Sequence, residues 1–120
     1  MRKKKDIYTI IENGRPVTIS GDDRDAFLMT DLSDEKKVEV VNILRDWFET
    51  STKTSLRHTS YGMKHWLEDA VGCYISNNQF KDAMLSLGFE PSDYSELNWC
   101  FRVKPTKALK KYLEESGRWW

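Results

Sequence analysis

The stretch RHTSYGMKHW, residues 57–66, is the densest group of potentially reactive side chains in this 120-residue chain. It holds two histidines, a tyrosine, a lysine and two hydroxyl side chains. Imidazole is a frequent general base and the commonest metal ligand in proteins. Four interpretations therefore compete for this stretch: an active site, a metal site, a nucleic-acid contact and the ordinary start of a helix.

Spacing argues against metal and catalytic chemistry. The soft metal-ligand candidates His58, His65, Cys73 and Cys100 match no paired zinc signature. Cys73 and His65 could act as nucleophile and base, but no third orienting group is placed beside them. The sequence also lacks a glycine-rich phosphate loop and a serine elbow. We therefore expect no catalytic residue, no metal and no cofactor, with an enzyme built on the region of Tyr61, His65 and Cys73 as a third alternative.

Composition indicates one globular domain. Hydrophobic residues make up 39% and charged residues 32%, and five each of tryptophan, tyrosine and phenylalanine argue against disorder. No apolar run approaches the ~20 residues that a membrane crossing needs, and no signal peptide follows the basic N-terminus. We expect a cytoplasmic protein without a membrane partner, in which the two cysteines stay reduced.

Charge is balanced but unevenly distributed. The chain has 19 basic and 19 acidic residues, so its net charge gives no general preference for nucleic acid. Residues 21–50 carry four basic and nine acidic groups, which is a net charge of −5 between basic ends. This acidic segment is a candidate protein-binding surface.

Periodicity, caps and turns predict an α+β fold. The capping box SNNQ, residues 76–79, begins a third helix, and only GCYI separates it from the second, which is helix-turn-helix geometry. With the first helix and a following strand, this is the order of a winged helix-turn-helix, whose third helix enters the major groove. The elements expected are a hairpin over 7–20, helices over 34–48, 60–71, 77–87 and 107–117, and a strand over 97–103. The single domain over 1–120 would comprise a hairpin and connector (1–32), a three-helix winged helix-turn-helix-like core (33–104) and a C-terminal helix and tail (105–120).

A nucleic-acid surface follows from this architecture. Asparagine and lysine side chains on the exposed face of the third helix suit bases and phosphates. Lysines stand in the N-terminal half of the last helix, against its dipole, which suits contact with an anion; the alternative is a solvated face. The candidate contacts are Arg57, His58, Lys64, Asn77, Asn78, Lys81, Arg102, Lys104, Lys107, Lys110 and Lys111.

Within RHTSYGMKHW, helical spacing assigns separate roles. Thr59 or Ser60 is expected to cap the second helix, and Met63 and Trp66 to make its first core contacts. Lys64 would then stay outside with Arg57, His58 and His65, as a small cationic edge beside the helix-turn-helix.

The run YGMKHWLEDAVGCYISNNQFKDAMLSLGFEP resembles the C-terminal winged-helix segments of phage and plasmid primase-helicases. Those have an aromatic-bearing helix, a short (V/I)S turn and a helix of the form F-x-x-A-(M/L)-x-x-x-GF. The chain is also similar to small proteins of Gram-positive mobile elements that carry H-T-S-Y-G-x-K-H followed by NWxFRV. Over residues 57–104 the resemblance implies a groove-facing helix from Asn77 to Leu87 and a wing from Asn98 to Arg102.

Two functions are expected from these observations. The first is a non-enzymatic phage or mobile-element protein that contacts nucleic acid through the winged helix-turn-helix. The alternative is a protein-binding inhibitor of a host defence nuclease, because small, charge-balanced, aromatic-rich proteins of mobile elements resemble anti-CRISPR inhibitors. Acidic side chains would then mimic phosphates and tryptophans would anchor the interface. The residues for this alternative are Asp22, Asp23, Asp25, Trp119 and Trp120. The sequence leaves open whether the tryptophans pack on the core, and what the oligomeric state is.

Overall fold

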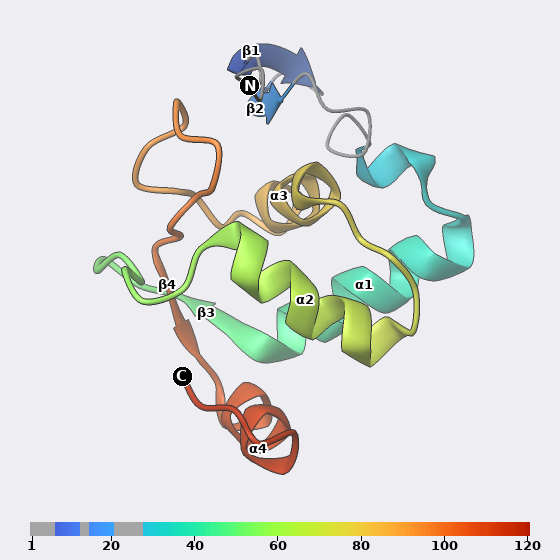
Figure 1. Cartoon of the computed structure of the whole chain (residues 1–120), viewed down its shortest axis with the longest axis vertical. Coiled ribbons are helices and arrows are strands. Elements are labelled where there is room, and N and C mark those ends of the chain that lie inside the picture. The colour runs from blue at the N-terminus through green and yellow to red at the C-terminus, as the bar shows by residue number, and fades with distance from the viewer. Residues whose placement is uncertain (1–6, 13–14, 21–27) are drawn as a thin grey trace, which may run out of the picture.

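The chain has the α+β fold class that the sequence predicts, shown as a computed structural model in Figure 1. The structure describes residues 7–12, 15–20 and 28–120. The hairpin turn expected at 13–14 and most of the connector, 21–27, lie outside these residues. The elements in chain order are β1 (Ile7–Glu12), β2 (Arg15–Ser20), the 3-10 helix η2 (Met29–Asp31), α1 (Asp34–Trp47), β3 (Phe48–Thr50), α2 (Ser60–Val71), α3 (Asn77–Ser86), β4 (Val103–Pro105) and α4 (Lys107–Glu115).

Helix ends follow the capping signals. Ser33 Oγ accepts a hydrogen bond from the Lys36 N–H at the start of α1. The capping box of α3 is confirmed, since Ser76 Oγ accepts from the Gln79 N–H at 3.0 Å and Gln79 Oε1 accepts from the Ser76 N–H at 2.9 Å. Gly72 ends α2 in the left-handed conformation, with φ of 71°, which glycine adopts without a steric penalty.

The start of α2 differs in part from the expectation. Thr59 is its N-cap, but the Thr59 side chain makes no capping hydrogen bond. Ser60 is fully buried, and its Oγ accepts from the backbone N–H of Trp99 at 3.0 Å. The Ser60 hydroxyl therefore ties α2 to the segment before β4, a contact between residues far apart in the chain.

Two short antiparallel pairs form the β structure. β1 pairs with β2 along its whole length, which confirms the hairpin. β3 pairs with β4, and just before β4 an isolated bridge joins Pro91 to Phe101. The strand expected over 97–103 is thus replaced by β4, and β3 was not expected. A three-residue strand shows no readable alternation, so its partner, more than 50 residues away in the chain, decides whether it forms.

One apolar cluster unites the helices and the segment before β4. α2 packs against α1 and α3, and α4 packs against α1. Figure 1 shows β1 and β2 beside α3 at one end and α4 at the opposite end. In the described part of the chain, no helix combines the length and apolar character that a bilayer crossing needs. The largest fully buried apolar residues are Trp99, Phe80, Phe101, Leu44, Met63, Leu67, Ile75, Met84, Leu109 and Leu113.

Candidate nucleic-acid interface

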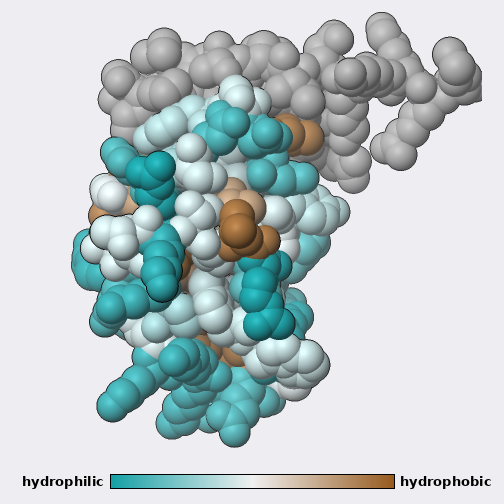
Figure 2. Space-filling model, turned by 90° about the vertical axis from the view of Figure 1, so that its left-hand side faces the viewer, coloured by the Kyte–Doolittle hydropathy of each residue, from teal (hydrophilic) through white to brown (hydrophobic). Residues whose placement is uncertain are grey.

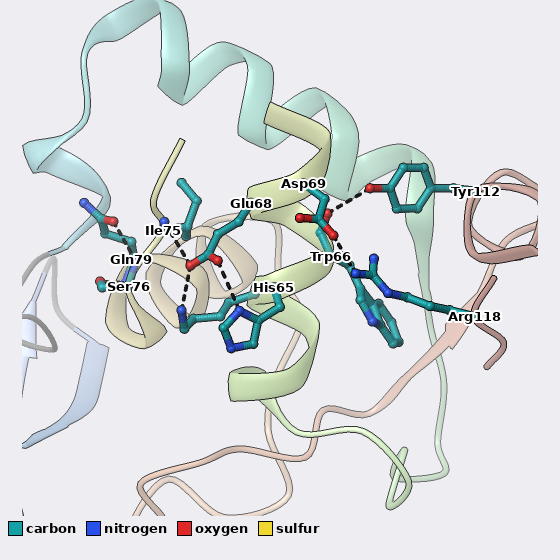
Figure 3. Close-up of polar contacts among 10 residues, drawn as sticks. His65, Trp66, Glu68, Asp69, Ile75, Ser76, Gln79, Tyr112 and Arg118 are labelled. Atoms are coloured by element: carbon teal, nitrogen blue, oxygen red, sulfur yellow. Dashed lines mark hydrogen bonds and ion pairs between the residues drawn. The ribbon is translucent and has the colours of Figure 1, made fainter. Parts of the chain in front are cut away.

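Glu68 organises the junction between α2 and α3. Its Oε1 accepts from Lys64 Nζ at 2.6 Å and from the Ile75 N–H at 3.3 Å, and its Oε2 lies 3.1 Å from His65 Nδ1 (Figure 3). Burial alone would raise the pKa of Glu68, but hydrogen bonds from these three donors and the charge of Lys64 hold the pKa below its usual value. The carboxylate thus stays ionised and fixes the turn that orients α3.

Lys64 is part of this junction and not of the surface. Its side chain is 4% exposed, and its ammonium lies 5.3 Å from the ring centre of Tyr61 and 4.8 Å from that of Tyr74. The expectation that Lys64 stays outside is therefore wrong. The cause is the ion pair with Glu68, which allows a lysine to be buried beneath two tyrosine rings.

The polar face of α3 is also covered. Asn77, Asn78 and Lys81 are 2%, 0% and 0% exposed, whereas the sequence predicts that they face solvent. β2 and η2 pack against α3, and Asn77 Nδ2 donates to the backbone oxygen of Leu97 at 3.1 Å. A polar helix face has the same pattern whether water or another part of the chain covers it, so periodicity alone misplaced these residues.

Neighbouring contacts on α3 tie it to the rest of the fold. Asp82 Oδ2 accepts from the Met29 N–H at 3.0 Å, which joins η2 to α3. Lys81 Nζ lies 4.5 Å from the ring centre of Trp99. The amide atoms of Asn78 have no hydrogen-bond partner among the described residues. In this structure α3 therefore presents none of its three candidate contacts to a ligand.

Exposed cations of the candidate set lie instead on β4, directly before it, on α4 and in the loop before α2. Lys104 is paired with Glu49, with Nζ and Oε2 3.6 Å apart. The other exposed cations among the sequence-predicted contacts have no carboxylate partner among the described residues. Figure 2 shows hydrophilic side chains over the lower end of the molecule, where Figure 1 places α4. The exposed cations of the candidate set, hereafter the basic surface, are Arg57, Arg102, Lys104, Lys107, Lys110 and Lys111.

His58 is half-buried and packs between two indole rings. Its ring centre lies 4.9 Å from that of Trp66 and 4.9 Å from that of Trp120. Burial lowers the pKa of His58, and the nearby charge of Arg57 lowers it further. His58 Nε2 is buried and has no hydrogen-bond partner in the described ranges. The imidazole therefore serves as a neutral aromatic spacer between two indoles.

Stability is expected to fall as His58 becomes protonated. Because the folded pKa is below the unfolded value of about 6.5, the unfolded chain binds the proton first. The contribution of His58 is thus complete above that pH and is lost as the pH falls towards the folded pKa. Denaturant unfolding measured at intervals from neutral to mildly acidic pH should show a smaller loss for His58→Phe than for the wild type.

His65→Gln is the matched control for this measurement. This variant keeps His58 and its lowered pKa, so the loss of stability that His58 causes on acidification should remain. The lowered pKa of Glu68 acts in a more acidic range and does not overlap. An unchanged pH dependence in His58→Phe would contradict the assignment.

The two C-terminal tryptophans divide between core and surface. Trp120 packs against Phe48, His58 and Trp66, whereas Trp119 is 73% exposed. Trp119 lines two hollows of about 540 and 400 Å³. Both are lined by Gly117, Arg118 and Trp119; the first adds Lys110, Glu114 and Trp120, and the second adds His58, Gly62 and Trp66.

Arg118 is a site residue that sequence reasoning missed. Its Nη2 donates to Asp69 Oδ2 at 2.5 Å, which joins the C-terminal tail to α2 (Figure 3). Beside it, the Tyr112 hydroxyl donates to the backbone oxygen of Trp66 at 3.2 Å. The sequence shows an arginine between a helix-ending glycine and two tryptophans, but nothing in it identifies Asp69, 49 residues earlier, as the partner.

Three groups of candidates from the sequence remain: the aspartates, the cysteines and the possible metal ligands. Asp22, Asp23 and Asp25 lie outside the described residues. Cys73 and Cys100 are free and partly buried. Within the described ranges, no three histidine, cysteine or carboxylate side chains come together as a metal site would require.

Comparisons with known proteins give no family for this chain. No family model matches it, and searches of curated proteins and of solved structures find no match either. Its function must therefore be inferred from its own residues and their contacts.

Proposed function

We propose that this chain is a non-enzymatic nucleic-acid-binding protein of a phage or mobile element, built on a winged helix-turn-helix frame. The element order supports the frame, since α1, β3, α2 and α3 are followed by a β-bridged loop and β4. β4 pairs with β3, and the Arg102 N–H donates to the Glu90 oxygen at 2.9 Å on the other side. In this proposal the wing is the loop between Pro91 and Phe101, which contains most of the wing expected from Asn98 to Arg102.

The basic surface carries the proposal. In α1 and α2, lysines pair with carboxylates, as in Lys37 with Asp34 and Lys64 with Glu68. Lys107, Lys110 and Lys111 are exposed and have no such partner among the described residues. Lys107 and Lys110 also stand in the first turn of α4, at its positive end, where cations are unfavourable without a counterion. Phosphate groups would supply that counterion, and their contact with lysine is largely independent of sequence.

Binding is tested with fluorescently labelled duplex and single-stranded oligonucleotides of mixed sequence at increasing salt. We expect polarisation to rise at low salt and the affinity to fall steeply as salt increases. Lys110→Glu with Lys111→Glu should weaken binding, and the slope of log affinity against log salt should fall by about one for each lysine that contacts phosphate.

Lys37→Glu with Arg45→Glu on α1 is the control of equal charge change. It should weaken binding much less than the pair on α4, because neither residue belongs to the basic surface. Equal losses for the two pairs would mean that only net charge matters. If micromolar wild-type protein binds neither duplex nor single strands at low salt, the proposed function is wrong.

One observation favours the alternative, a protein-binding inhibitor of a host nuclease. Trp119 is 73% exposed, and an exposed indole is a frequent anchor in protein interfaces. Trp120 does not support it, since its ring packs on Phe48 and Trp66. Inhibition of a purified nuclease by an equimolar amount of this chain, in the absence of nucleic-acid binding by the chain itself, would favour this alternative.

A further inference from the structure

Trp119 projects from a fixed base. After α4, Gly117 turns the chain with φ of 76°, and the Arg118 N–H donates to the Leu113 oxygen at 2.7 Å. The Arg118 guanidinium is held by Asp69, and the Trp120 ring lies against His58. Both chain neighbours of Trp119 are thus anchored, so its exposed position is set by the fold.

The exposure of Trp119 is unfavourable unless a ligand covers it. An indole buries roughly 150–250 Å² when it is enclosed, at about 25 cal/mol per Å². Here Trp119 lines two hollows and is largely exposed, so flat ligand groups can approach its ring. Trp119 with the two hollows is called the Trp119 surface below.

Cations flank this surface along one face of α4. Lys110 lines the larger hollow, and Lys107 lies one helical turn before it on the same face. Glu114 also lines that hollow, and Arg118 is engaged by Asp69, so the lysines supply the available positive charge. An aromatic platform beside free lysines is the arrangement that binds single strands, whose bases stack while their phosphates follow the cations.

Charge also decides between a nucleic acid and a protein as the ligand. Lysine is depleted in protein interfaces, whose centres exclude charge. Lys110 lines the larger hollow of the Trp119 surface, and Lys107 precedes it by one helical turn, whereas the carboxylate of Glu114 lessens the positive charge there. A duplex, in turn, hides the faces of its bases in the stack and offers Trp119 little to bind.

We infer that the Trp119 surface binds unpaired nucleotides, with a base stacked on the Trp119 ring and neighbouring phosphates contacted by Lys110 and Lys107. The inference rests on the proposed function and names single-stranded nucleic acid as its ligand. Base stacking on an aromatic side chain contributes about 1–3 kcal/mol per base, which corresponds to roughly 5- to 150-fold in affinity.

The test uses the full chain and labelled oligothymidylate of about 16 nucleotides, the upper range of a single binding module. Trp119→Ala should weaken binding at least about fivefold, whereas Trp119→Phe should retain most of the affinity because it keeps a stacking ring. Oligothymidylate should also quench the intrinsic tryptophan fluorescence of the wild type more than that of Trp119→Ala. Val38→Ala removes an exposed apolar side chain from α1 and should bind like the wild type.

These measurements distinguish a failure of the stacking site from a failure of the proposed function. If Trp119→Ala binds oligothymidylate like the wild type while Lys110→Glu with Lys111→Glu does not, the basic surface stands and the stacking site is wrong. If Trp119→Phe loses as much affinity as Trp119→Ala, stacking is also wrong. A Trp119 surface used only by a protein partner would likewise leave oligothymidylate binding unchanged in Trp119→Ala. Equal circular dichroism spectra for the variants exclude unfolding as the cause of a loss.

Discussion

Replacing Glu68 with alanine is expected to destabilise the protein by about 3 kcal/mol, the lower end of the range for breaking a buried ion pair. The change removes the acceptor of Lys64 Nζ and leaves that ammonium buried beneath Tyr61 and Tyr74. It also removes the acceptor of the Ile75 N–H. The lower end applies because the Glu68 side chain is 20% exposed, so water can partly replace it. Urea unfolding followed by far-ultraviolet circular dichroism measures the loss.

The double variant Lys64→Met with Glu68→Gln is the matched control. Methionine keeps the apolar stem of Lys64 between the tyrosine rings, and glutamine can still accept from the Ile75 N–H. This variant should lose much less stability than Glu68→Ala, because no charge remains buried without a partner. Alanine is a strong helix former, so helix propensity does not explain a loss in Glu68→Ala. Equal losses would show that packing of the Glu68 stem, and not its charge, stabilises the junction.

Signals contained in short stretches of sequence predicted most of the helices correctly. The Ser33 cap, the Ser76 and Gln79 capping box and the Gly72 stop each depend on residues within one helical turn. The starts of α1 and α3 and the end of α2 follow from them. Trp99 and Phe101, alternate residues of the strand expected over 97–103, are both fully buried, although neither belongs to a strand.

Contacts between distant parts of the chain were not predictable in this way. β3 exists because β4 pairs with it, and the polar face of α3 is covered by β2 and η2. The burial of Lys64 was not predictable for the same reason. A lysine four residues before a glutamate usually lies on the surface, and here the neighbouring rings of Tyr61 and Tyr74 cover it. For the site, the exposed lysines of α4 were identified from sequence, whereas the separate fates of Trp119 and Trp120 were not.

The burial of the polar face of α3 bears directly on how nucleic acid would be bound. A groove-reading α3 requires Asn77, Asn78 and Lys81 to reach solvent, and each is less than 3% exposed. α4, which carries Lys107, Lys110 and Lys111 and leads into the tail with Trp119, lies at the end of the molecule opposite to β1 and β2 (Figure 1). The binding proposed here therefore uses that end of the fold and requires no movement of the hairpin.

Replacing Trp99 with alanine is expected to destabilise the protein by about 3–5 kcal/mol, the range for removing a large aromatic ring from a core. Trp99 is fully buried, and its ring centre lies 5.2 Å from that of Tyr94 and 5.8 Å from that of Phe101. The indole also carries the Lys81 ammonium above its face at 4.5 Å. Its loss leaves a cavity and takes a favourable contact from a buried charge. Because small domains are stable by only about 5–15 kcal/mol, a large unfolded fraction is expected on mild heating.

Trp119→Ala is the control for this effect, since it removes the same side chain from an exposed position. It should change the free energy of unfolding by no more than about 0.5 kcal/mol. Trp99→Phe should fall between the two, because a phenyl ring keeps part of the contact with Tyr94 and Lys81. Guanidinium unfolding of the three variants gives the order directly. If Trp99→Ala were as stable as Trp119→Ala, the segment before β4 would not be part of the core, and the wing position proposed for the loop ahead of it would lose its anchor.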